Sequence, residues 1–262
     1  MTRLSPRDAV LVLVDIQNDF CHPEGTMGRR GMDLSAVRRA VDQAERLLAA
    51  ARGAGVPVVF VRTEHGDGVD SDAWRHRYAG GIGTGEPPAA ANCLTGSWGA
   101  RFHRLRPRPG EDVAVKHRYS AFGSPGFRAR LAAHGRGSLV VAGVTTNVCV
   151  ESTLRSAVDA DLLGSVVADA CAAYDAAEHD AAITVISRHF GRAFPTAEVL
   201  AHWRPEGPDR PEGTLRAPRR PERGRSGRHG RRGRPGDQGE DARAGRATAR
   251  LHHDDEANGP VS

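Results

Sequence analysis

Residues 9–15, AVLVLVD, decide the fold. Such a near-continuous apolar run is typical of a strand that is buried on both faces of a parallel sheet. Residues 33–55 then have an acidic and serine start, apolar residues at helical spacing and a glycine stop, which predicts a helix. A second apolar strand pattern, VPVVFVRT, follows at 56–63. The chain therefore begins as a strand–helix–strand unit.

The same alternation continues to the tryptophan at position 203. Further strands are predicted at 112–116, 138–144 and 165–170, further helices at 125–135, 147–164 and 175–191, and a short strand with a partial helix in 193–203. The long loop at 64–109 is rich in glycine and proline, so we expect it to be functional or helical in short pieces. We predict an α/β fold with three αβα layers, built on a doubly wound, mainly parallel sheet of about six strands.

Residues 205–262 have a different composition. Glycine, proline, arginine and acidic residues dominate, and the only large apolar side chains are Leu215, Leu251 and Val261. Such a segment buries too little apolar surface to offset the entropy lost on ordering. We predict one globular domain over residues 1–204 and a disordered tail over 205–262.

The charge and the cysteines narrow the class of protein. The formal net charge is +5, but the arginines of the tail alternate with acids and lack aromatic neighbours, so no nucleic-acid partner is expected. No stretch approaches the ~20 apolar residues of a membrane span, and no secretory signal is recognised. The four cysteines include no CxxC pair and predict no disulfide framework. We expect a cytoplasmic protein.

Three polar residues lie at the ends of predicted strands. Asp15 ends the first strand, Lys116 ends the third, and Cys149 lies in the first turn of the helix after the fourth. Lys116 is the only lysine in a chain that otherwise uses arginine. Ligands bind doubly wound sheets beyond the carboxyl ends of the strands, so the three side chains are expected to meet in one crevice.

Each of these residues also has an ordinary explanation, because Asp15 can cap a turn, Cys149 can be a small core residue, and one lysine must fall somewhere. Together they favour nucleophilic catalysis. A helix N-terminus and an ammonium group both lower the pKa of a thiol, and a carboxylate can take its proton and return it to a leaving amine. Lysine suits this role because the pKa of its side chain can be shifted enough for the group to pass protons, whereas the pKa of arginine cannot.

The motifs LVLVDIQNDF, TGSWGARF, VKHRYSAF and VAGVTTNVCVEST, in this order and spacing, resemble the isochorismatase-like cysteine hydrolases. The resemblance covers about residues 6–203. It implies a catalytic triad of Asp15, Lys116 and Cys149.

The resemblance also implies features around the nucleophile. A non-proline cis peptide is expected between Val144 and Thr145, and the backbone N–H groups of Thr145 and Cys149 are expected to form an oxyanion hole. Members of the family are commonly homodimers or homotetramers, so the same is expected here.

Within this family the residues favour one chemistry. Members that hydrolyse the vinyl ether of isochorismate often lack the cysteine, so Cys149 implies hydrolysis of an amide or ureide of a small molecule through a thioester. The nicotinamidase branch binds a metal through an Asp–x–His pair after the second strand, where this chain has Thr63 and His65. The missing acid predicts no metal, and no other cofactor is expected. His65 is then expected in the pocket wall or on the surface.

The motifs CLTGSWGARF and TTNVCVESTLR look most like the ureidoacrylate and N-carbamoyl amidohydrolase branch, which releases ammonia and carbon dioxide through carbamate. Candidate substrate-pocket residues flank the motifs, with core packing as the alternative: Phe20, Trp98, Tyr119 and Phe122.

Two other functions stay open at this point. One is vinyl-ether hydrolysis by Asp15 with Cys149 incidental, in which case a Cys149→Ala variant stays active. The other is a non-catalytic binding protein, in which the Cys149 thiol has an ordinary pKa.

Overall fold

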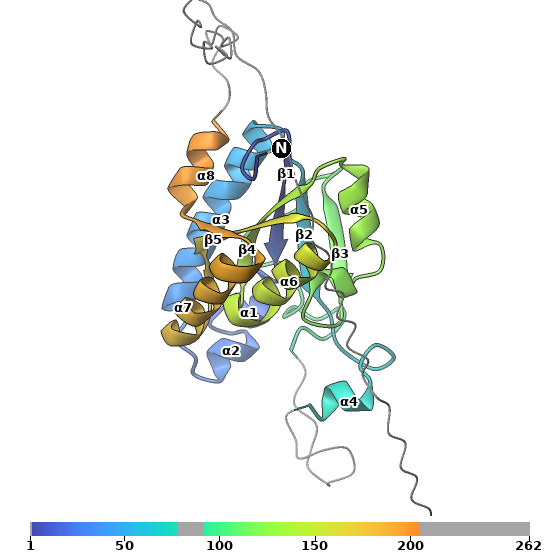
Figure 1. The fold of residues 1–262 in the computed structure, drawn as a ribbon. Helices are drawn as coiled ribbons and strands as arrows, with labels where there is room; N and C mark the ends of the chain where they lie inside the picture. The colour runs from blue at the N-terminus through green and yellow to red at the C-terminus, as the bar shows by residue number, and fades with distance from the viewer. Residues whose placement is uncertain (1, 78–91, 205–262) are drawn as a thin grey trace, which may run out of the picture. The chain divides into compact units, whose positions relative to one another are not determined.

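The computed structural model describes residues 2–77 and 92–204, and the predicted tail at 205–262 lies outside them. The described residues form a sheet covered by helices (Figure 1). The strands are β1 (Ala9–Val14), β2 (Val58–Thr63), β3 (Asp112–Lys116), β4 (Ser138–Val144), β5 (Leu163–Ala172) and β6 (Arg192–Phe194). The α-helices are α1 (Asn18–Cys21), α2 (Thr26–Arg29), α3 (Ser35–Gly53), α4 (Asp72–Arg75), α5 (Phe127–Ala133), α6 (Glu151–Asp159), α7 (Ala176–Val185) and α8 (Thr196–His202). Three further helical turns are η1 (Ala121–Gly123), η2 (Thr146–Val150) and η3 (Ile186–Phe190).

The six strands form one sheet in the order β3-β2-β1-β4-β5-β6, and every neighbouring pair is parallel. The predicted α/β fold with a doubly wound sheet is confirmed. The strand order reverses between β1 and β4, which is where such sheets open a crevice at their carboxyl ends.

Strand β1 connects the two halves of the core, because alternate side chains of a strand point to opposite faces. Leu11 and Leu13 belong to the cluster formed with α3 and α8, which run side by side in Figure 1. Val10 and Val12 belong to the second cluster, formed with α5 and α6. Both faces of β1 are therefore covered, which explains why its sequence is apolar without alternation.

Strands β1 and β4 approach very closely at their carboxyl ends. Gly143 has φ 138°, and a Cβ placed on it would lie 2.0 Å from the carbonyl oxygen of Val14. Directly after this contact, Asp15 adopts a left-handed conformation with φ 52°. Aspartate is one of the few residues that enter this region readily, so the chain turns sharply at the point where the crevice begins.

The connections differ in detail from the predicted elements. The loop at 64–109 contains the short helix α4, in which the hydroxyl of Ser71 accepts a hydrogen bond from the N–H of Trp74, while residues 78–91 lie outside the described part. The predicted helix at 147–164 is instead the π-helical turn η2 followed by α6. No helix in the described ranges is long and apolar enough to cross a membrane.

We expect Gly143→Ala to destabilise the fold strongly, because its Cβ would meet the backbone of β1 and not a movable side chain. The expected loss is about 3 kcal/mol or more in the free energy of unfolding, measured by urea denaturation. Gly123→Ala is the matched control, since a Cβ there meets nothing closer than 3.8 Å. Equal stability of the two variants would contradict the tight approach of β1 and β4.

Candidate active site

A buried ion pair lies at the carboxyl edge of the sheet. The ammonium nitrogen of Lys116 is 2.7 Å from Oδ2 of Asp15, and the two side chains are 1% and 0% exposed. The same nitrogen donates to the carbonyl oxygen of Arg118 at 3.0 Å and lies 3.4 Å from Sγ of Cys149. An ammonium group has three N–H donors, so each has an acceptor here. The structure brings the three predicted triad residues together.

The sheet order explains how Lys116 reaches Asp15. Strand β3 is not a neighbour of β1, because β2 lies between them. Lys116 is in register with Thr63, the last residue of β2, and its side chain extends past that strand end to Asp15. The hydroxyl of Thr63 donates to the carbonyl oxygen of Lys116 at 3.3 Å, which links the two strand ends.

Cys149 lies in η2, at the start of the helical segment that continues into α6. The peptide bond between Val144 and Thr145, which connects β4 to this turn, is cis. Thr145 and Cys149 both line a cavity at this edge. The nucleophile candidate and the two residues expected to donate to an oxyanion therefore border the same space.

The protonation state of Cys149 differs from the expectation. Burial raises the pKa of the Cys149 thiol, the negative charge of Asp15 raises it further, and the charge of Lys116 opposes these effects without overcoming them. The predicted lowering of this pKa is therefore wrong for the free protein. The cysteine rests as a thiol, and its proton leaves when a base accepts it.

Lys116 has the opposite balance. Burial lowers the pKa of its ammonium group, but the negative charge of Asp15 and the hydrogen bonds to Asp15 and Cys149 outweigh burial, so the pKa is raised. Lys116 therefore remains a cation and does not exchange protons near neutral pH. A lysine suits the site because a compact charge with three donors matches the three acceptors around it.

Gln17 is a positioning residue that the sequence analysis missed. Its side chain is fully buried and accepts the N–H of Thr63, while its amide nitrogen donates to the carbonyl oxygens of Thr63 and Ala100, each at 2.8 Å. These bonds fix the end of β2 beside the turn after β1. Its place in the LVLVDIQNDF motif was the available signal, because a polar residue next to a buried strand end needs partners.

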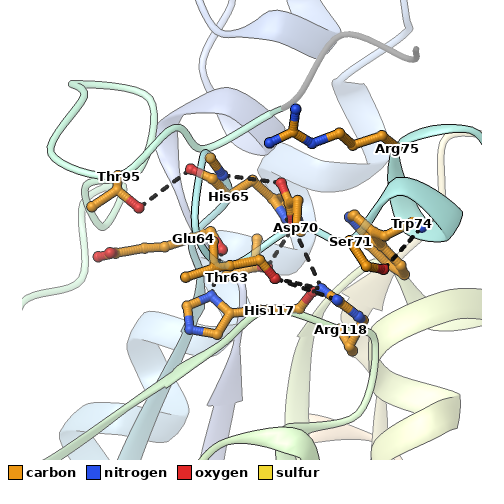
Figure 2. A network of polar contacts seen from close by, with 12 residues as sticks. Thr63, Glu64, His65, Asp70, Ser71, Trp74, Arg75, Thr95, His117 and Arg118 are labelled. Atoms are coloured by element: carbon orange, nitrogen blue, oxygen red, sulfur yellow. Dashed lines mark hydrogen bonds and ion pairs between the residues drawn. The ribbon is translucent and has the colours of Figure 1, made fainter.

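His65 belongs to a second polar network, drawn in Figure 2. Its Nδ1 is 2.9 Å from Oδ1 of Asp70, and its Nε2 is 3.2 Å from the hydroxyl of Thr63. Asp70 also accepts the N–H of Gly66 at 3.0 Å and lies 3.5 Å from the guanidinium of Arg118. His65 lines the cavity, and the network fixes its ring against the wall.

This arrangement does not fit a metal of the kind bound by the nicotinamidase branch. Thr63 offers a hydroxyl where that branch has a carboxylate, and both ring nitrogens of His65 already have partners. Within residues 2–77 and 92–204, no group of three or more His, Cys, Asp or Glu side chains is arranged to hold a metal ion.

The cavity above Cys149 has a volume of about 320 Å³. Of the four aromatic candidates, Phe20 and Tyr119 line it, while Trp98 and Phe122 do not. Trp98 is 42% exposed and packs edge-on against His22, and Phe122 packs edge-on against Phe127 in the core. Flanking a motif in sequence does not determine the direction of a side chain.

Sequence reasoning did not select the other residues of the wall, most of which come from the segments after β2 and β3. They include Met27, Asp67, Asp70, Trp74, Arg75, Arg77, Arg118 and Val148. The one signal for Trp74 was an aromatic residue among arginines in a glycine-rich loop, just after the helix-capping Ser71.

Comparison with known proteins identifies the family. The model of the isochorismatase domain matches residues 9–198. The chain belongs to the isochorismatase family. The match covers all six strands and the three residues at the crevice. The protein is therefore an enzyme of the hydrolase class.

Several relatives carry one name. A protein of Methylobacterium radiotolerans named ureidoacrylate amidohydrolase RutB is 35% identical over 220 residues, covering 79% of this chain and 85% of its own. The protein of the same name from Pseudomonas savastanoi pv. phaseolicola is 34% identical over 176 residues, covering 64% of this chain and 72% of its own.

Solved structures agree with the fold. A cysteine hydrolase from Pseudomonas syringae pv. phaseolicola superposes with a TM-score of 0.66 at 26% identity, covering 78% of this chain and 95% of its own. An isochorismatase family protein from Desulfovibrio vulgaris gives a TM-score of 0.61 at 28% identity, covering 74% and 99%.

The charges around Cys149 predict opposite effects of two substitutions on its alkylation by iodoacetamide at pH 8. Asp15→Asn removes a charge that raises the thiol pKa, so labelling becomes faster, while Lys116→Ala removes a charge that lowers it, so labelling becomes slower. Lowering the thiol pKa by one unit gives about tenfold more thiolate. The thiolate of a more acidic thiol is a weaker nucleophile, so the net change in the labelling rate is roughly threefold.

Mass spectrometry of the labelled peptides measures these rates, with buried Cys171 as the internal reference. Asp112→Asn, which removes a carboxylate paired with Arg130 outside the site, is the matched control and leaves the rate unchanged. Slower labelling in both Asp15→Asn and Lys116→Ala would contradict the assignment.

Proposed function

We propose that this protein hydrolyses the C–N bond of a small-molecule amide or ureide, with Cys149 as nucleophile, Asp15 as proton acceptor and donor, and Lys116 as the fixed positive charge. The observation that carries the proposal is the single ammonium group in contact with both Asp15 and Sγ of Cys149 at the edge of the cavity. The names of the relatives support a C–N bond as the target.

The first half of the reaction forms a covalent intermediate. Asp15 accepts the proton of the Cys149 thiol as Sγ attacks the carbonyl carbon, and the carbonyl π electrons move to oxygen. The backbone N–H groups of Thr145 and Cys149 stabilise this oxyanion. The C–N bond then breaks as the oxyanion collapses, and the protonated Asp15 gives its proton to the leaving nitrogen. An amine leaves and a thioester remains.

The second half releases the acyl group. Asp15, again a carboxylate, accepts a proton from water while the water oxygen attacks the thioester carbon. Collapse of the second oxyanion breaks the C–S bond, and the proton on Asp15 returns to Sγ. With a ureide the acyl group is a carbamoyl group, so the product is carbamate, which decomposes to ammonia and carbon dioxide. An N-carbamoyl compound or a ureidoacrylate is the proposed substrate.

Lys116 does not move a proton in this scheme. Its charge supports the thiolate as it forms and keeps Asp15 oriented toward the sulfur. The raised pKa of Lys116 agrees with this role, because the group stays charged while Asp15 and Cys149 exchange one proton.

The raised pKa of Cys149 keeps one rival open, namely vinyl-ether hydrolysis by Asp15 alone. Cys149→Ala separates the two reactions. We expect the variant to lose roughly 10³-fold or more in kcat for ammonia release from 3-ureidopropionate, because an alanine cannot form the thioester. Mass spectrometry of the native enzyme during turnover is expected to detect the carbamoyl adduct as an increase in mass of the peptide that contains Cys149 and of no other peptide.

A Cys149→Ala variant that retains activity on an enol-ether acid would favour the rival. A native protein that turns over neither substrate class would favour a binding protein. Gel filtration with light scattering of the same preparations tests the proposed homodimer or homotetramer.

Lys116→Arg is expected to lose at least about 100-fold in kcat although the charge is kept, because a planar guanidinium cannot make the three contacts of the buried ammonium. Kinetics on the same ureide measure the loss, and circular dichroism checks the fold. Wild-type kcat in this variant would remove the geometric reason for the single lysine.

A further inference from the structure

The cavity wall carries more positive than negative side chains. In the described part of the chain, its positively charged residues are Lys116, Arg75, Arg77 and Arg118, and its negatively charged residues are Asp67 and Asp70. Lys116 is already neutralised by Asp15 beneath it. The three arginines therefore exceed the two aspartates, and a low-dielectric cavity with this balance attracts anions.

Arg118 makes one short contact, a hydrogen bond of 2.6 Å from a terminal nitrogen to the carbonyl oxygen of His117, and its other contacts are long. Its two terminal nitrogens each donate to the carbonyl oxygen of Val69 at 3.3 Å, and one lies 3.5 Å from Oδ1 of Asp70. Asp70 has shorter bonds from His65, which is drawn beside it in Figure 2, and from the N–H of Gly66. The Arg118 side chain is 41% exposed. A carboxylate in the cavity can accept from this guanidinium without leaving Asp70 unpaired.

Arg75 is held no more strongly. Its ion pair is with Asp67 at 2.7 Å, and the side chain of Asp67 is 99% exposed. Such a pair contributes little, since water screens it and both side chains lose freedom to form it. A ligand anion that enters the cavity therefore competes easily with Asp67 for Arg75.

Trp74 gives this part of the cavity a rigid wall. The ring of His65 is stacked on it with centroids 5.5 Å apart, and the guanidinium of Arg118 lies 4.8 Å from its centroid. Stacking on an aromatic face restricts the orientation of a guanidinium group. Arg118 is therefore presented to the cavity as a preorganised donor.

The position of Arg118 also fixes the length of the ligand. The Lys116 ammonium contacts both Sγ of Cys149 and the carbonyl oxygen of Arg118, so the backbone of Arg118 begins next to the reacting atom. Its guanidinium lies over the ring of Trp74 on the same wall. A molecule that reaches from Sγ to the guanidinium has only a few bonds between its reacting carbon and its charged end.

We infer that the outer part of this cavity is a carboxylate-binding subsite, in which Arg118 and Arg75 bind the anionic end of a short substrate whose C–N bond lies at Cys149. The subsite follows from the wall itself, while the statement that its ligand is cleaved rests on the proposed function. Arg118 is then the residue that selects ureido acids over neutral ureides.

The test separates binding from catalysis. Titration calorimetry on the intact Cys149→Ala protein measures Kd for 3-ureidopropionate and for 3-ureidopropionamide, which differ in charge and little in shape. We expect the acid to bind about tenfold more tightly, as a charge-assisted hydrogen bond predicts, and Arg118→Gln added to this background to abolish the preference. Arg75→Gln reduces it by less, because the backbone of Arg118, and not that of Arg75, adjoins the Lys116 ammonium beside Sγ of Cys149.

Arg130→Gln is the matched control, an exposed arginine paired with Asp112 outside the cavity, and it leaves the preference unchanged. Equal Kd values for the acid and the amide, or equal losses in Arg118→Gln and Arg130→Gln, would overturn the subsite even if the native enzyme hydrolyses ureides. Selective binding of the acid without turnover by the native enzyme would support the subsite and refute the proposed hydrolysis instead.

Discussion

The buried ion pair between Asp15 and Lys116 is the constraint on which the rest of the site depends. Removing two charges from water is costly, and the pair persists only when geometry and additional hydrogen bonds compensate. Here the compensation comes from the side of the lysine, since Lys116 has three acceptors and Gln17 fixes the strand end that Lys116 passes, while Oδ1 of Asp15 has no hydrogen-bond partner among the described residues. Loss of one charge would leave the other uncompensated, so the pair couples the stability of the fold to the chemistry of the thiol.

Much of the fold was predictable from the sequence, because a strand that is buried on both faces has a simple pattern of apolar residues. A strand such as β1, covered by helices on both sides, is apolar throughout, and the amphipathic α3 beside it shows helical spacing. The positions of Asp15, Lys116 and Cys149 followed from the same regularity, since parallel strands place their carboxyl ends at one edge.

Three features of the site were beyond that reasoning, each for a physical reason. The wall around Trp74 comes from loops, whose side-chain directions depend on tertiary contacts and not on a period. Trp98 and Phe122 are close to motifs in sequence yet face solvent and core. The pKa of Cys149 depends on how burial, Asp15 and Lys116 balance, which only distances and burial can decide.

The close approach of Gly143 to β1 divides the site into two parts with different freedom to change. The reacting groups stand on strands whose backbones nearly touch, so the chain there tolerates almost no rearrangement. Much of the wall that faces the substrate belongs instead to residues 65–77 and 118–119, none of which is a member of the two core clusters. Natural divergence or directed evolution can therefore redesign which molecules are accepted by altering those segments, while the chemical step is inherited unchanged.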